Sequence, residues 1–208
     1  MADTLASRSP HREPDGEDLG AGAPLRLVAG DGFSGWHALN DTVMGGRSSG
    51  RCRTTTQGLV FDAEVVETGG GFVSCRSPLF SPPLDLSAYR ALRLELSGDG
   101  RRYKLAVACG DGMAGLTELI PGGVRWIAEF GTAAEGGSDV VVPFKQLRAS
   151  VRARPIQSLP LGMPLRFDAS RITRLQLLHS KFGDNGGLNS GFRAGPLHLE
   201  LRSIHALP

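Results

Sequence analysis

Hydrophobic and polar residues alternate strictly in several short segments of the chain beyond residue 24. In the segment 92–96 three leucines alternate with Arg93 and Glu95, and the segment 197–202 repeats this pattern. A period of two is typical of β-strands with one buried face. Alternation and apolar content together predict strands over the segments 58–67, 92–96, 103–109, 124–130, 139–144, 172–178 and 197–202.

Glycine-rich turns separate these segments. The turn signals are GDG at 98–100, PGG at 121–123, EGG at 135–137 and GDNGG at 183–187. The best candidate for a helix is short, at 144–149. About eight strands joined by long, glycine-rich loops predict an all-β domain, in which two sheets bury their apolar faces against each other as a β-sandwich.

The first 24 residues differ from the rest of the chain. They contain five acidic residues and two arginines, and they lack the apolar stretch of a secretion signal. We interpret residues 1–24 as a disordered leader and residues 25–208 as one β-sandwich domain. Because no run of about 18 apolar residues occurs, no transmembrane helix is predicted. A cytoplasmic protein, at most peripheral to a membrane, is expected.

Composition and charge narrow the class of protein further. The chain has 29 glycines, 13 prolines and 40% hydrophobic residues, which suits a globular protein rich in turns. Its net charge of +2 gives no strong field for binding nucleic acid or membranes. Arginine supplies 20 of the 23 basic residues. Arginine suits bidentate recognition of carboxylate or phosphate, although codon usage in a GC-rich genome is the simpler explanation.

The cysteines predict neither a disulfide framework nor a zinc site. Cys52, Cys75 and Cys109 are few and scattered, and no two have a CxxC spacing. This usage favours three free thiols in a reducing compartment. Cys52 lies between two arginines, which would favour its thiolate. An unreactive thiol is nevertheless the default expectation for Cys52.

One glycine motif resembles a nucleotide-binding fingerprint. Gly110, Gly112 and Gly115 have the GxGxxG spacing and follow a predicted strand. The phosphate would also need the N-terminus of a following helix. Pro121 and Gly122 arrive before such a helix can form, so nucleotide binding at this loop is only an alternative.

Catalytic and metal-binding patterns are weak. No GxSxG or SxxK motif is present, and His37 and His179 are the only histidines placed where a site could form. A structural role is the default for both. Asp184 and Asn185 resemble part of a calcium loop, but the regular acidic spacing is missing, which favours a turn. We therefore expect a protein that is not an enzyme and uses no metal or cofactor.

Carbohydrate binding would need exposed aromatic side chains. The chain has two tryptophans and two tyrosines. Trp126 and Tyr103 share the parity of apolar neighbours and are expected to face the core. Trp36 lies in a loop-like context and is the one aromatic side chain left free for stacking. This gives little support to a sugar site.

Several motifs, in order and spacing, resemble those of the complex I intermediate-associated protein 30 family. The resemblance begins with the polar, glycine-dense segment NDTVMGGRS at 40–48 and continues with GGFVSCR at 70–76 and LDLSAY at 84–89. It then includes GDGRRY at 98–103, VPF at 142–144 and the strand 197–204. It covers residues 25–206, essentially the whole expected domain.

The resemblance implies both a fold and a function. The fold implied is a galactose-binding-like jelly roll, akin to certain carbohydrate-binding modules. Mitochondrial members of the family are assembly factors for respiratory complex I, and plastid relatives serve photosystem biogenesis. A compact member without an attached dinucleotide domain resembles the stand-alone bacterial type.

We therefore expect a non-catalytic binding module, an assembly factor or chaperone for a respiratory or photosynthetic membrane complex, with a protein partner and no nucleic acid. A carbohydrate-binding module and a nucleotide-dependent protein are the alternatives. The residues expected to line or support the partner site are Trp36, Asn40, Asp41, Met44, Arg47, Ser48 and Arg76. A purely structural interpretation is that Asn40 and Asp41 tie a loop to the sheet edge while Met44 fills a gap in the core.

Overall fold

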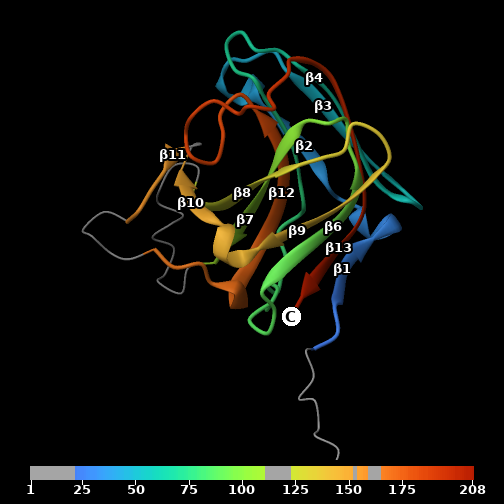
Figure 1. The fold of residues 1–208 in the computed structure, drawn as a ribbon, viewed down its shortest axis with the longest axis vertical. Coiled ribbons are helices and arrows are strands. Elements are labelled where there is room, and N and C mark those ends of the chain that lie inside the picture. The colour runs from blue at the N-terminus through green and yellow to red at the C-terminus, as the bar shows by residue number, and fades with distance from the viewer. Residues whose placement is uncertain (1–21, 111–122, 152–153, 159–164) are drawn as a thin grey trace, which may run out of the picture.

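The computed structural model describes residues 22–110, 123–151, 154–158 and 165–208. Strands dominate these residues (Figure 1). The strands are β1 (Leu25–Ala29), β2 (His37–Asn40), β3 (Ser49–Thr55), β4 (Gly58–Val65), β5 (Phe72–Arg76), β6 (Ala91–Ser97), β7 (Arg102–Cys109), β8 (Arg125–Gly131), β9 (Gly137–Pro143), β10 (Arg148–Val151), β11 (Arg154–Pro155), β12 (Ile172–Ser180) and β13 (Gly195–Leu207). Short 3-10 turns are η1 (Gly30–Phe33), η2 (Asp41–Met44), η3 (Phe144–Gln146) and η5 (Ala169–Arg171).

The strands form two antiparallel sheets. The six-stranded sheet has the order β3-β4-β13-β6-β9, with β1 also paired to β13, and the seven-stranded sheet has the order β11-β10-β8-β7-β12-β5-β2. The chain crosses between the sheets repeatedly, so that β13 lies between β4 and β6, and β12 lies between β7 and β5. This arrangement confirms the predicted all-β, jelly-roll β-sandwich.

The core lies between the sheets and is built from the alternating apolar residues. Leu94 and Leu96 of β6 belong to the same buried cluster as Leu105 of β7 and Leu177 of β12, and each is at most 1% exposed. Burial of one such side chain contributes about 2 kcal/mol to the hydrophobic driving force. The predicted inward parity of Trp126 is confirmed, since its ring packs at the edge of the core.

The segment 144–149 differs from its prediction as a helix. Only the 3-10 turn η3 forms, and the chain then enters β10. Arg148 and Ala149 pair with Ile127 and Trp126 of β8. The ladder to β8 satisfies backbone groups that an isolated turn of helix would leave exposed, and so tertiary pairing overrides the local preference.

The expectation of three free thiols is wrong. Cys52 of β3 and Cys75 of β5 form a disulfide, with their Cα atoms 6.4 Å apart. Both side chains point inward from opposite sheets, where Cys52 is paired in register with Phe61 and Cys75 with Leu177. Residues 23 positions apart in sequence meet because the sheets face each other, which spacing alone does not reveal. Cysteine usage therefore gives no basis for inferring a reducing compartment.

The first strand of the domain lies close to the N-terminal limit of the described residues. Strand β1 begins at Leu25 and pairs with Ala206 near the C-terminus. The leader interpretation concerns residues 1–24, of which residues 1–21 lie outside the described residues. Within the described ranges, no helix has the length and apolar character needed to cross a bilayer.

Candidate functional site

Residues 40–48, here called the end loop, connect β2 to β3 at one end of the sandwich. Asp41 at the start of η2 is fully buried. Its carboxylate accepts hydrogen bonds from the backbone N–H of Ser48 (2.9 Å), the Ser48 hydroxyl (2.7 Å), and the backbone N–H groups of Gly71 (2.7 Å) and Phe72 (3.3 Å). This one side chain fastens both ends of the end loop to the start of β5.

The protonation of Asp41 follows from these contacts. Burial by itself raises the pKa of the Asp41 carboxyl, but the hydrogen bonds from Ser48, Gly71 and Phe72 outweigh burial and hold the pKa below its usual value. The Ser48 hydroxyl also accepts a bond of 2.9 Å from the N–H of Val66. Because Asp41 and Ser48 are both buried, they support the end loop from within and present no surface to a partner.

Two glycines make room for the Asp41 carboxylate. A Cβ atom at Gly46 would lie 2.2 Å from Cγ of Asp41, and one at Gly70 would lie 2.2 Å from its Oδ2. Gly45 has a φ of +84°, a left-handed conformation that favours glycine. The glycine-dense motifs at 40–48 and 70–76 therefore encode a close approach of two loops around one carboxylate.

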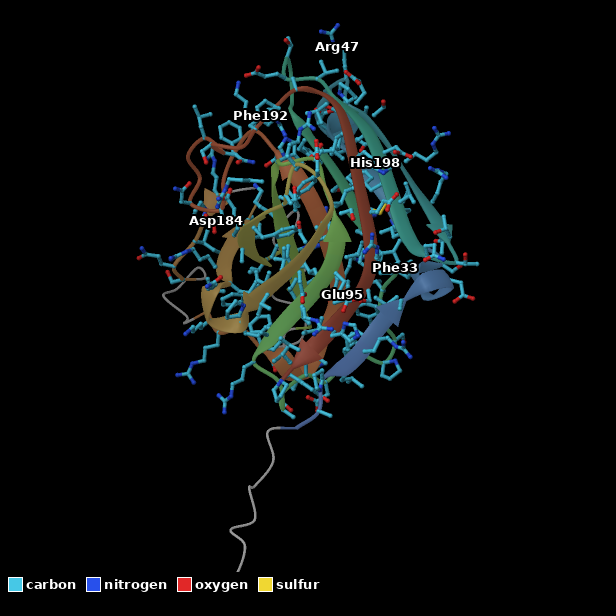
Figure 2. All side chains as sticks on the ribbon, turned by 45° about the vertical axis from the view of Figure 1, so that its right-hand side comes forward. Phe33, Arg47, Glu95, Asp184, Phe192 and His198 are labelled. Atoms are coloured by element: carbon cyan, nitrogen blue, oxygen red, sulfur yellow. A yellow bond between two sulfur atoms is a disulfide. The ribbon has the colours of Figure 1, made fainter. Side chains whose placement is uncertain are left out.

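The end loop also carries exposed side chains. Val43 is 64% exposed, and Arg47 projects from the tip of the domain (Figure 2). Asn40 pairs with Val73 on the inner side of β5, and its Oδ1 is buried with no hydrogen-bond partner in the described part of the chain. η2 ends at Met44.

Trp36 is not the free aromatic side chain expected from the sequence. It is 8% exposed, and its ring packs edge-on against Phe33 with centroids 5.4 Å apart. It lines a small, mostly apolar cavity of about 230 Å³ together with Leu27, Phe80 and Leu84. The turn formed by Trp36 N–H and the Phe33 carbonyl brings the ring back onto the core, and so the aromatic support for a sugar site is lost.

Arg76 lies apart from the end loop, on the outer face of the seven-stranded sheet. Its Nε donates a hydrogen bond of 2.8 Å to Nε2 of His37 on the neighbouring strand. The His37 Nδ1 in turn donates to the Gly35 carbonyl at 3.2 Å, which fixes the tautomer by its partners. The structure therefore places Arg76 apart from both the end loop and Trp36, and it gives His37 an orienting role.

Arg125 and Arg174 share this face with Arg76, although no motif in the sequence singles them out. Arg174 pairs with Ala108 of β7, and Arg125 directly precedes Trp126, which pairs with Val107. The sequence does indicate that both side chains point outward, because each arginine stands next to an apolar residue that faces the core. Parity identifies the face, but only the register shows which residues meet on it.

His179 has a structural role. It is fully buried, its Nδ1 donates to the Arg102 carbonyl at 2.8 Å, and its Nε2 accepts from the N–H of Arg193 at 3.4 Å. The ring stacks on Phe192 with centroids 5.4 Å apart. Burial lowers the pKa of His179 and keeps the ring neutral. With both nitrogens in use, this histidine has no position left for a substrate.

Lys104 is another buried basic residue of the seven-stranded sheet. It is 1% exposed, and its ammonium donates a hydrogen bond to the Phe182 carbonyl. Burial lowers the pKa of Lys104 to about 8, although the charges of Glu129 and Asp184 oppose the shift. The ammonium fastens the loop after β12 to the sheet.

The remaining candidates give no site. The GxGxxG match at 110–115 lies outside the described residues except for Gly110, whose N–H donates to the Arg171 carbonyl at 2.7 Å. The stretch at Asp184 and Asn185 is a turn, in which the Asn185 side chain accepts from the N–H of Gly187 at 2.8 Å. Among the described residues no group of three or more His, Cys, Asp or Glu side chains could hold a metal ion.

Solved structures show what this fold is similar to. The family 11 carbohydrate-binding module of the cellulosomal cellulase Lic26A-Cel5E of Clostridium thermocellum matches with a TM-score of 0.58 and 13% identity, over 90% of this chain and 96% of that one. A family 11 module from the same organism, in complex with a beta-1,3-1,4-mixed-linked tetrasaccharide, matches with a TM-score of 0.57 and 13% identity, over 88% of this chain and 95% of that one. The agarase AgWH50C matches with a TM-score of 0.50 and 11% identity, over 89% of this chain and 25% of that one.

Sequence comparison identifies the family. A search of curated proteins gives no significant match. Among models of protein families, that of complex I intermediate-associated protein 30 matches residues 26–201, which is most of the chain and includes the end loop, its Asp41 anchor and the first residues of β5. The chain therefore belongs to the complex I intermediate-associated protein 30 family.

Proposed function

We propose that this protein is a non-catalytic binding domain, an assembly factor or chaperone that holds a protein subunit of a respiratory or photosynthetic membrane complex. The end loop is the contact surface in this proposal. The observation that supports this proposal is that the end loop combines a buried anchoring residue with exposed side chains. Asp41 anchors the loop through four hydrogen bonds, while Val43 is exposed and Arg47 projects from the tip of the domain.

A loop fixed in this way is suited to binding. Ordering a flexible loop on association costs about 0.5 to 1.5 kcal/mol for each immobilised side chain, and a loop that is already ordered avoids part of this cost. Arginine is enriched among the residues that dominate interface energies. Neither a salt bridge nor a hydrogen bond links the Arg47 side chain to another described residue, so its guanidinium is available to a partner. Membership of the family supports a subunit of a membrane complex as the partner.

Affinity capture from the native host tests the proposal. The tagged wild-type protein should retain a subunit of a membrane complex, identified by mass spectrometry. The variants V43S and R47E should lose it, because one removes exposed apolar surface and the other reverses the charge of the loop. Leu79 is a matched control, since it is 65% exposed and follows the far end of β5 from the end loop. Capture that survives V43S and R47E, or that L79S abolishes equally, would contradict this function.

Carbohydrate binding is the second candidate. Its support is the fold shared with family 11 carbohydrate-binding modules, and a likeness at 13% identity extends to the fold alone. The burial of Trp36 counts against it. A glycan array distinguishes the two functions. A carbohydrate-binding module should give a signal on the array, whereas a protein-binding module should give none.

A further inference from the structure

The outer faces of the two sheets differ in their charge. On the six-stranded sheet, acidic and basic side chains alternate and pair, as Arg53 does with Asp62 and Arg93 with Glu95. On the seven-stranded sheet, most of the charged side chains at outward positions of the strands are basic. The register assigns to that face Arg76, Arg102, Lys104, Arg125, Arg148 and Arg174, with Glu129 as the acid among these strand residues.

Three of these arginines form one cluster, here called the arginine face. Arg125 on β8 and Arg174 on β12 flank Ala108 of the strand between them. Arg76 lies on β5, two residues farther along the sheet, where it pairs with Gln176. The central strand contributes only small side chains, because Ala106 and Ala108 are its outward residues at these positions. The three longer guanidinium side chains can therefore converge above it.

The positive charges of the arginine face are not compensated within the described ranges. Arg76, Arg125 and Arg174 make no salt bridge there. Burial lowers the pKa of Arg125, and the charge of Arg76 lowers it further. Burial and the charges of Arg76 and Arg125 likewise lower the pKa of Arg174. Holding like charges together in a half-buried position costs stability, and a bound anion would relieve that cost.

We propose that the arginine face binds an acidic segment of a protein in extended conformation, at a site separate from the end loop. Successive outward rows on this sheet are two residues apart, a distance of about 6.8 Å. Carboxylates on alternate residues of an extended segment have the same spacing. One carboxylate meets the row of Arg125 and Arg174, and the next meets the row of Arg76, whose Nε is already held by His37. Guanidinium groups bind carboxylates in bidentate geometry.

The surroundings of the arginine face favour a protein segment over a membrane surface. Peripheral proteins combine basic residues with apolar side chains that insert into the lipid interface. In the described part of the chain the exposed large hydrophobic side chains are Leu25, Val43, Leu79, Val141, Phe182 and Leu188. None of these stands at an outward position of the strands that carry the arginine face.

The test measures fluorescence anisotropy of a labelled decapeptide in which glutamate alternates with threonine, titrated with the full chain at low salt. R174Q and R76Q should each raise the Kd by about tenfold, since each removes one charge-assisted contact. Arg51 is a matched control, because it is exposed and belongs to the six-stranded sheet. R51Q should leave the Kd within about twofold of the wild-type value.

Four outcomes decide the proposal. The arginine face is supported if the peptide binds, if its glutamine analogue does not, and if R174Q and R76Q weaken binding selectively in proteins with unchanged thermal unfolding. An unchanged Kd in both variants overturns it, and so does an equal loss in R51Q. Binding of phosphatidylserine vesicles that depends on Arg174, without binding of the peptide, overturns the assignment to a protein segment. V43S and R47E should leave the peptide Kd unchanged, so failure of this site is separable from failure of the end loop.

Discussion

At the scale of single residues, Asp41 explains why the motifs of this chain have their composition. Its carboxylate accepts two hydrogen bonds from Ser48 and one each from the N–H groups of Gly71 and Phe72. Gly46 and Gly70 make room for it because they carry no Cβ atom. The sequence allowed two interpretations of Asp41, either contact with a partner or support of the loop. The geometry places the side chain inside the protein, and the exposed Val43 is left to make contact.

Replacing Asp41 with asparagine should destabilise the fold. The amide keeps one acceptor oxygen but turns an NH₂ group toward backbone N–H donors, so we expect a loss of about 2 to 4 kcal/mol in the free energy of unfolding at neutral pH. Urea denaturation measures this loss. Asp31 is exposed at the start of η1, and D31N should change the stability by less than about 0.5 kcal/mol.

The effect of D41N should also depend on pH. The pKa of Asp41 is depressed in the folded state, so its contribution is present above the unfolded value of 3.8 and is lost as the pH falls through the folded value. The difference in stability between wild type and D41N should therefore be constant from pH 7 down to about 4 and shrink at lower pH. If the difference in the free energy of unfolding stays the same down to pH 2, the charge of the Asp41 carboxylate does not stabilise the loop.

At the scale of elements, alternation predicted the regular strands well and the irregular ones poorly. Strands β6 and β13 bury one face against the core and leave the other at least partly exposed, so their sequences carry a clear period of two. Strand β7 is buried on both faces, but its core-facing residues follow the same period. Short strands such as β2 and β11 are set by pairing with neighbours, which no local pattern records. The same limit explains why Arg125 and Arg174 were missed, because register across β7 depends on the whole sheet.

The packing of the turn before β5 against η2 gives a prediction at this scale. In G70A the new Cβ would lie 2.2 Å from Oδ2 of Asp41, and that carboxylate is fixed by its hydrogen bonds. We expect G70A to lower the free energy of unfolding by about 1 to 3 kcal/mol, as overpacking of a closed site does. Gly131 ends β8 with no atom within 4 Å of its Cβ position. Thermal unfolding of G131A should match the wild type, and equal losses in both variants would mean that glycine replacement in general is responsible.

At the scale of the whole molecule, the sandwich separates its tasks by location. The core and the disulfide join the two sheets, the end loop closes one end, and the outer face of the seven-stranded sheet carries the uncompensated arginines. In Figure 2 the labelled His198 and Glu95 lie on the six-stranded sheet, where each belongs to an ion pair, and Arg47 projects from the end. Composition predicted a nearly neutral protein, and a net charge does not show how unevenly the charge is distributed over two faces.

The bond between Cys52 and Cys75 is the only disulfide cross-link between the two sheets in the described residues, and its removal should affect the stability of the whole domain. Closing a loop of 23 residues lowers the conformational entropy of the unfolded chain, which stabilises the folded state by about 3 kcal/mol. Reduction, or the double variant C52S/C75S, should therefore lower the Tm by roughly 10 °C in a domain of this size. Cys109 is the control, because it is free and partly buried, and burial raises the pKa of its thiol to about 12. C109S should keep the full response to reductant, since the response belongs to the other two cysteines. If native protein alkylates at three cysteines without denaturant, and its Tm does not respond to reductant, then the sheets are held by packing alone.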